Sequence, residues 1–195
     1  MTASCQTAFK EWAVVVEALG GGEQILILRK GGIHEQRGQF RVEHRRFWLY
    51  PTQFHEAEPS VIPSKRPAVR ALAAAASPDS VDIQYVADVV AVHWLSEPAA
   101  WKRLQGLHIW SEHILQQRFE FGREPGLHAL VVRVHRAPQP VRLPVRAQYG
   151  GCKSWIELER PLATDSLEPV LPASEFAQQT AAITALLTAD AHAHA

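Results

Sequence analysis

The sequence is poor in cysteine and has no long hydrophobic run. With only two cysteines, Cys5 and Cys152, it is typical of a reducing compartment and cannot form a cysteine-rich zinc site. No stretch approaches the ~20 consecutive apolar residues of a membrane-spanning helix. The first residues, MTASCQTAFKEW, also lack the basic and apolar segments of a signal peptide. These absences argue against a membrane or secreted protein, and we expect a cytoplasmic one.

Net charge is absent as well, because 20 Lys and Arg balance 20 Asp and Glu among the 195 residues. A general polyanion binder is usually basic overall, and this chain is not. The charge is nevertheless uneven. Residues 29–46 hold six Lys or Arg against two acids, residues 133–153 hold five against none, and residues 157–175 are acidic. If the two basic segments meet in space they form a positive patch; solvated strand edges are the alternative.

The order of apolar runs and turn residues predicts alternating strands and helices. Helical spacing of apolar residues favours a helix over residues 7–19, ended by Gly20–Gly22, although the β-branched run Val14–Val16 also suits a strand. Strands are predicted at residues 25–28, 46–51, 81–95, 126–136 and 154–158, and helices at 65–76, 98–106, 111–119 and 174–187.

Serines and prolines mark several ends of these elements. Ser64 and Ser111 stand where N-cap residues belong, at the starts of two predicted helices. Pro138, Pro140 and Pro144 follow the strand at 126–136, and we expect them to keep the chain extended outside any sheet interior.

Together these elements predict a single α+β domain with a mixed or mostly antiparallel sheet flanked by several helices. No internal repeat or change of composition indicates a second domain. We expect the domain to cover residues 9–188, between a flexible N-terminus at 1–8 and a flexible tail at 189–195.

A charged corner follows the apolar strand in the segment ILILRKGGIHE at residues 25–35. Arg29 and Lys30 lead into Gly31 and Gly32, where backbone N–H groups could approach a bound anion while the two cations neutralise it. The P-loop pattern GxxxxGK[ST] and the dinucleotide pattern GxGxxG are both missing. The alternative is an ordinary charged turn in which the glycines supply positive φ.

The ten histidines offer a second kind of chemistry. His34 precedes Glu35, and His55 precedes Glu56, so each pair could supply a general acid and base or metal ligands. HExxH is absent, and we assign no metal. Surface histidines or histidines that make structural hydrogen bonds are the alternative.

Part of this region resembles Nudix hydrolases in outline. QILILRK followed by FWLYP is similar to the strand and the aromatic-Leu-Pro corner of that family. The glutamate-rich, magnesium-binding helix with its REXXEE pattern is missing. The missing helix excludes Nudix catalysis and leaves only a fold alternative.

Aromatic residues stand at or near the ends of predicted elements, close to cations or histidines. They are Trp48, Trp94, Trp101, Trp110 and Trp155. Rings beside arginines suit the stacking of unpaired bases, whereas tryptophans that fill the core are the alternative. The segment HIWSEH favours a site most, because His108, Trp110 and His113 gather at a helix start.

The segment GGCKSW at residues 150–155 contains the second cysteine. Lys153 follows Cys152 and could lower the pKa of its thiol. A nucleophile would also need an oriented histidine, so a buried and inert cysteine is the alternative.

Six blocks of the sequence resemble, in order and wording, the bacterial domain of unknown function numbered 1802, which is common in cyanobacteria. They are FKEWAVVVEAL, ILILRKGGIHE, FWLYPTQFHE, HIWSE, GLHALVVRVHR and GCKSWIEL, from about Phe9 to Leu158. The resemblance implies an uncharacterised function. Some members occur beside a restriction-endonuclease domain of the Mrr type, which implies an accessory role in restriction–modification or DNA metabolism.

Three hypotheses follow. The first is a module that binds nucleic acid or a nucleotide. The second is a small metal-dependent hydrolase that uses His34, Glu35, His55 and Glu56. The third is a protein-interaction subunit without a site of its own. We favour the first, with no cofactor assigned. Its candidate binding residues are Arg29, Lys30, Gly31, Gly32, His34, Arg45, Trp48, His108, Trp110 and Lys153.

Overall fold

The computed structural model describes residues 3–30, 34–36, 39–41, 44–53, 58–151 and 153–188, with the backbone alone for 34–36 and 39–41. The elements, in chain order, are β1 (Ser4–Trp12), α1 (Ala13–Gly20), β2 (Leu26–Arg29), β3 (His34–Gln36), β4 (Gln39–Arg41), β5 (Arg46–Thr52), η1 (Glu58–Ser60), η2 (Pro63–Lys65), α2 (Arg66–Ala75), β6 (Ser80–Leu95), α3 (Pro98–Lys102), α4 (Glu112–Glu120), β7 (Leu127–Pro144), η3 (Ala147–Tyr149), β8 (Trp155–Ala163), β9 (Glu168–Pro169) and α5 (Ala173–Thr188).

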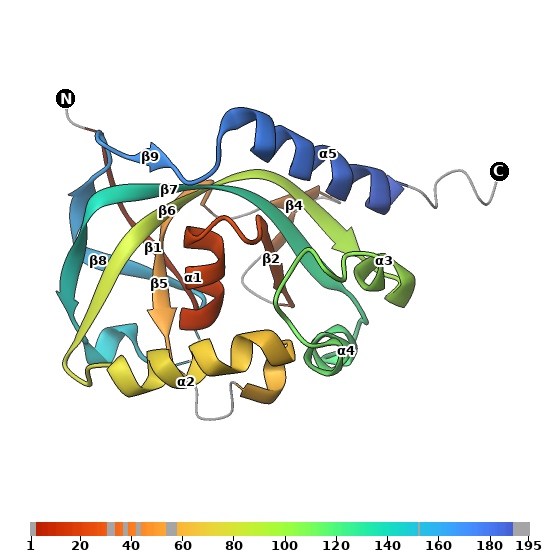
Figure 1. Cartoon of the computed structure of the whole chain (residues 1–195), viewed down its shortest axis with the longest axis horizontal. Helices are drawn as coiled ribbons and strands as arrows, with labels where there is room; N and C mark the ends of the chain where they lie inside the picture. Colours follow the sequence, from red (N-terminus) through yellow and green to blue (C-terminus); the bar gives the residue numbers. More distant parts are fainter. Residues whose placement is uncertain are drawn as a thin grey trace.

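One seven-stranded sheet organises the molecule (Figure 1). Its order is β2-β7-β6-β5-β1-β8, and the short β9 pairs with β7. Only β1 and β5 run parallel, whereas the other pairs are antiparallel. A separate hairpin joins β3 and β4. This mixed sheet with its surrounding helices confirms the predicted α+β class.

The long strands β6 and β7 form a curved ribbon that arches over α1 (Figure 1). Their register shifts between Ile83 and Tyr85 on β6. The prolines keep the chain extended as predicted, but their predicted position outside the sheet is wrong, because Pro138, Pro140 and Pro144 all lie within β7. Pro138 and Pro140 fall opposite this shift, where the ladder is interrupted and a missing N–H costs little.

The N-terminal segment corrects a second prediction. Residues 7–19 do not form one helix, since β1 runs to Trp12 and α1 begins at Ala13. The Val14–Val16 run is helical, and every residue of α1 except Glu17 is buried. A helix surrounded by protein needs no polar face, so burial under the arch outweighs the strand preference of valine. β1 begins at Ser4, within the segment expected to be flexible.

The predicted serine caps are confirmed at only one position. Lys65 stands at the N-cap of α2, after the 3-10 turn η2 that contains Ser64. Ser111 does stand at the N-cap of α4, but its hydroxyl donates to the carbonyl of Pro59 at 2.9 Å and makes no capping hydrogen bond. Here a tertiary contact replaces the local one.

Two hydrophobic cores lie on the two faces of the curved sheet. The larger surrounds α1 and includes Phe9 and Trp110. The smaller is formed by β1, β5, β6, β7, η3 and β8, and it contains Trp48, Tyr50 and Tyr149. No helix within the described residues is long and apolar enough to cross a membrane.

Candidate functional site

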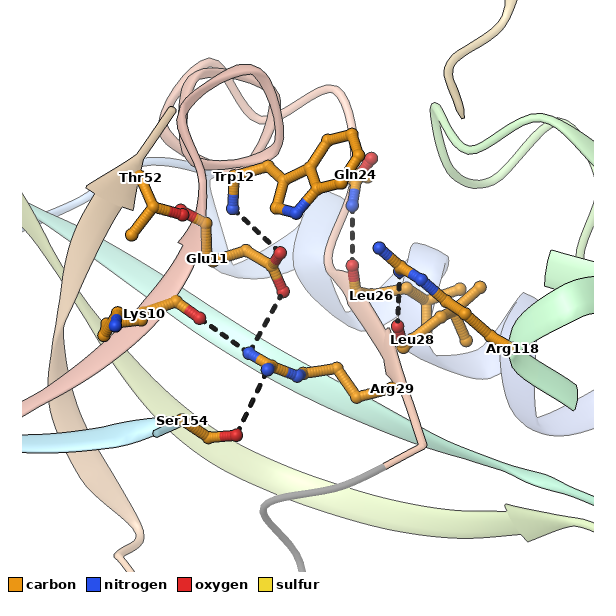
Figure 2. A network of polar contacts seen from close by, with 10 residues as sticks. All are labelled: Lys10, Glu11, Trp12, Gln24, Leu26, Leu28, Arg29, Thr52, Arg118 and Ser154. Carbon is orange, nitrogen blue, oxygen red and sulfur yellow. Dashed lines mark hydrogen bonds and ion pairs between the residues drawn. The ribbon is translucent and has the colours of Figure 1, made fainter. Parts of the chain in front are cut away.

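Arg29, at the end of β2, binds the protein itself (Figure 2). One guanidinium nitrogen donates to the carbonyl of Lys10 at 2.6 Å, and another donates to the hydroxyl of Ser154 at 3.1 Å. A carboxylate oxygen of Glu11, a residue only 3% exposed, lies 3.9 Å away. The guanidinium also stacks on the ring of Phe9, at 4.6 Å from its centroid. Arg29 is therefore largely engaged within the protein, and its contact with a ligand phosphate stays a prediction.

Lys30 also binds the protein itself, at the end of α4 and in the loop that follows it. Its ammonium donates to the carbonyls of Phe119, at 3.4 Å, and Glu124, and it lies 5.5 Å from the ring centroid of Trp94. Partial burial lowers the pKa of this amine, and the nearby Glu124 opposes that shift. The two cations after the strand thus hold two neighbouring loops in place.

The remaining residues of the corner are only partly described. Gly31 and Gly32 lie outside the described residues, as do His55 and Glu56. His34 and Glu35 belong to β3, for which the structure gives the backbone alone. The acid/base alternative built on these four polar residues therefore stays a prediction. Among the described residues, no three His, Cys, Asp or Glu side chains lie together as metal ligands would.

The predicted stacking residues are in the core. Trp48 is 0% and Trp110 is 1% exposed, so neither ring can receive a base. His108 is also buried, and burial lowers its pKa to about 4. The guanidinium of Arg118 covers the face of Trp110, with 3.8 Å between its central carbon and the ring centroid. The cluster at the start of α4 is structural, and the prediction of stacking at Trp48 and Trp110 is wrong.

The two basic segments meet, but an acid separates them. Asp88 on β6 pairs across the ladder with Arg46 on β5 and with Arg133 on β7. Arg46 forms a two-pronged ion pair with this carboxylate at 2.6 and 2.7 Å. Arg136 donates instead to the carbonyl of Gly20 at 2.9 Å. Most of the cations whose side chains the structure describes in these two segments are therefore matched within the protein, and these do not form one open patch.

A cleft of about 560 Å³ opens where β5 ends and β6 begins. Its walls come from the ends of β1, β5 and β7, from the starts of α1 and β6, from the end of α2, and from the loop that contains η3. The lining residues that carry polar side chains are Lys10, Glu17, Tyr50, Thr52, Gln53, Ser77, Ser80, Asp82, Arg142, Arg146 and Tyr149.

Two arginines line this cleft, and each forms an ion pair with a carboxylate. Arg142 uses Nε and one terminal nitrogen to bind Asp82 at 2.9 and 2.8 Å, and this pairing lowers the pKa of the carboxyl. Arg146 lies 2.9 Å, through Nε, from a carboxylate oxygen of Glu159. A guanidinium has more N–H groups than these contacts occupy, so both side chains retain donors for a ligand.

Two tyrosines line the cleft beside the smaller core. Tyr50 and Tyr149 meet edge to face at 5.8 Å between centroids, and both are almost buried. The hydroxyl of Tyr149 accepts the backbone N–H of Glu159 at 3.1 Å. Burial raises the pKa of Tyr50, so its phenol is protonated at neutral pH and can donate to a ligand.

The sequence indicated only part of this site, namely the basic segment that contains Arg142 and Arg146. No motif joins residues 10, 50, 82 and 149, which come from four separate parts of the chain. Of the exposed candidates, Lys153 lies two residues beyond the lining residue Gly151. Arg45 precedes β5 and is therefore at the opposite end of that strand from the cleft.

Fold and cleft define a single α+β domain in which a curved mixed sheet carries an arginine-bearing cleft at one end. The family described as "Domain of unknown function (DUF1802)" matches residues 8–182, and the chain belongs to this family. No curated protein matches the chain.

Solved structures of an ASCH protein from Zymomonas mobilis are similar to the chain. One crystal structure of this protein has 15% sequence identity, a TM-score of 0.45, and coverage of 90% of this chain and 92% of that one. A variant of the same protein has 14% identity, a TM-score of 0.46, and coverage of 94% and 99%.

Proposed function

We propose that the cleft binds the phosphate-bearing part of a nucleotide, either free or at the end of a single-stranded nucleic acid. The observation that carries the proposal is the pair of arginines, Arg142 and Arg146, whose guanidinium groups keep N–H donors unused at the cleft. Planar guanidinium forks match phosphate oxygens in geometry and charge.

Size and polarity of the cleft support a ligand of this kind. A volume of about 560 Å³ falls within the range of roughly 300–1,000 Å³ that is usual for small-molecule sites. Tyr50 and Tyr149 add aromatic edges and a phenol donor next to the arginines. Lys153, which is exposed just beyond the cleft, is a candidate contact for a strand that leaves it.

The charge of the lining argues against a long duplex as the ligand. Lys10, Arg142 and Arg146 are opposed there by Glu17 and Asp82, so the cleft is only slightly positive. Proteins that follow a duplex backbone instead neutralise many phosphates with a continuous basic surface. A ligand with one or two phosphates in the cleft fits these charges better.

A binding titration tests the proposal. Fluorescently labelled single-stranded DNA, RNA and duplex DNA, with and without a terminal phosphate, would be titrated at about 50 and 200 mM salt. Unlabelled mononucleotides would compete. We expect salt-sensitive binding of single strands or mononucleotides that carry a phosphate, weakened about tenfold or more by Arg142→Ala. Binding of single-stranded DNA would also support the accessory role in DNA metabolism that the family resemblance implies.

Arg70→Ala is the matched control, because Arg70 is also an exposed, ion-paired arginine but lies outside the cleft lining. It should bind like the wild type. If no nucleotide or nucleic acid binds at low salt, or if Arg70→Ala and Arg142→Ala weaken binding equally, the cleft is not a phosphate site.

A further inference from the structure

The loop that forms one wall of the cleft is held by a lysine from β1. The ammonium of Lys10 donates to the carbonyl of Tyr149 at 2.8 Å and to that of Gly151 at 2.7 Å. Both acceptors belong to residues that line the cleft, and so does Lys10. The charged group of Lys10 therefore binds the backbone of a loop that lines the cleft.

A second attachment holds the far end of the same loop. The N–H of Lys10 donates to the carbonyl of Ser154 at 2.9 Å. Arg29 bridges the two residues, because it binds the carbonyl of Lys10 and the hydroxyl of Ser154 (Figure 2). The carboxylate of Glu11 lies 3.9 Å from Arg29 and balances the positive charge of its guanidinium. Lys10 and Arg29 thus clamp the loop at residues 149, 151 and 154.

Apolar packing holds Tyr149, which is buried against Tyr50 in the smaller core, but it contributes little at the two glycines that follow. Gly151 has φ of +73°, and a Cβ added there would have no atom within 4 Å. At Gly150 the nearest neighbour of such a Cβ would be the carbonyl oxygen of Ala147, at 3.1 Å. Residues 144–148 are exposed. Side chains therefore hold little of the loop beyond Tyr149, and the hydrogen bonds from Lys10 fix the backbone at residues 149 and 151.

We infer that Lys10 is a positioning residue for the cleft, and that Arg29 acts behind it by fixing Lys10 and Ser154. The inference rests on the proposed function for its consequence in binding, but not for its consequence in the loop. Arg29, in the charged corner, would then act on the ligand through the loop and without touching it.

Hydrogen exchange in the absence of any ligand is the primary test. Lys10→Met should speed amide exchange over residues 147–154 by about tenfold or more, since two charge-assisted hydrogen bonds are lost. Lys10→Arg, which can still donate to both carbonyls, should restore slow exchange. Ser154→Ala, which removes one bond and no charge, should show a smaller increase. Lys102→Met, on α3 and away from the cleft, is the control and should leave the loop unchanged.

Binding by the same variants gives the second test. If Lys10 only positions the wall, Lys10→Met should weaken nucleotide binding several-fold while the dependence on salt stays that of the wild type. Arg142→Ala should reduce that dependence, because it removes a phosphate contact.

The outcomes separate the two proposals. Unchanged exchange in Lys10→Met would overturn the positioning role, whatever the wild type binds. A fall in salt dependence equal to that of Arg142→Ala would overturn it too, because Lys10 would then be a direct contact. Faster exchange in a protein that binds no nucleotide would support the clamp and reject the proposed function.

Discussion

Arg29 and Lys30 are placed by the end of β2, where the strand leaves the sheet between two loops. Arg29 binds the carbonyl of Lys10 on β1 and the hydroxyl of Ser154, and it approaches the buried carboxylate of Glu11. Lys30 binds the carbonyls of Phe119 and Glu124. A buried acid that loses its counter-charge is strongly destabilising, so the contribution of Arg29 to stability should be large.

We predict that Arg29→Met lowers the free energy of unfolding by about 2–3 kcal/mol, because it leaves Glu11 with a weaker counter-charge in a low-polarity site. Arg45→Met, at an exposed neighbouring position, should change it by no more than about 0.5 kcal/mol. Chemical denaturation measures both values. Equal effects would mean that the Arg29 network does not stabilise the fold.

Gly126 makes possible the close packing between β7 and the end of β6. A Cβ at this position would lie 2.1 Å from a ring carbon of Trp94, and φ is +149°. We predict that Gly126→Ala destabilises the protein by about 3 kcal/mol or more. Gly106→Ala should cost only about 1 kcal/mol, since Gly106 has positive φ but open space around it. Thermal unfolding of the pair would separate steric clash from backbone strain.

At the scale of elements, β2 is an edge strand whose outward-facing carbonyls are bound by side chains instead of by another strand. β7 pairs with one side of β2, and the carbonyls of Leu26 and Leu28 accept side-chain hydrogen bonds. Gln24 supplies the first and Arg118, from α4, supplies the second (Figure 2). Burial lowers the pKa of Arg118 to about 10, so it still carries its charge at neutral pH. These bonds remove acceptors that could template aggregation.

Of these two side chains, Gln24 binds backbone groups through both ends of its amide. Its amide nitrogen donates to the carbonyl of Leu26 at 2.6 Å, and its oxygen accepts the N–H of Ile109 at 3.0 Å. Gln24→Ala would leave two buried backbone groups unsatisfied, and we predict a loss of about 2–4 kcal/mol. Gln117→Ala, on the exposed side of α4, should be nearly neutral. A loss below about 1 kcal/mol for Gln24→Ala would show that the edge does not depend on it.

At the scale of the whole molecule, two buried histidines link stability to pH. Burial lowers the pKa of His108 and of His128 from 6.5 to about 4, and the charge of Lys30 adds to the effect at His128. The unfolded chain therefore binds more protons than the native state between pH 6.5 and 4. The stabilisation is complete above pH 6.5 and is lost as the pH falls.

We predict that the free energy of unfolding decreases by roughly 3 kcal/mol per histidine between pH 7 and pH 4. His108→Gln should flatten this dependence, whereas His113→Gln, at an exposed position, should preserve it. Denaturant titrations across this pH range measure the slope. An equal slope in all three proteins would contradict the assignment to His108.

The cleft is likewise a property of the whole molecule. Its lining brings together the ends of β1, β5 and β7 with the start of β6. The strands predicted at 46–51 and 81–95 are confirmed, but no pattern in the sequence shows that β5 lies between β1 and β6. Strand order depends on non-local pairing, which periodicity along the chain does not encode.

Local chemistry set what could be predicted from the sequence. Alternation and turn residues located the strands at 81–95 and 126–136, because side chains at a sheet face repeat every second residue. The same patterns give the α+β class and, with the quoted blocks, the family. The prolines show the limit of such local reasoning, because Pro138 and Pro140 lie within β7, opposite a register shift that the sequence does not reveal.

Tertiary structure decided what the charged and aromatic residues do. Arg29 and Trp110 are types that suit a ligand equally well, and only their neighbours show that one clamps a loop and the other fills the core. The Val14–Val16 run became helical because the arch of β6 and β7 buries it. Burial and hydrogen-bond partners are sums over segments distant in the chain, and so the sequence names candidate residues while the fold assigns them their roles.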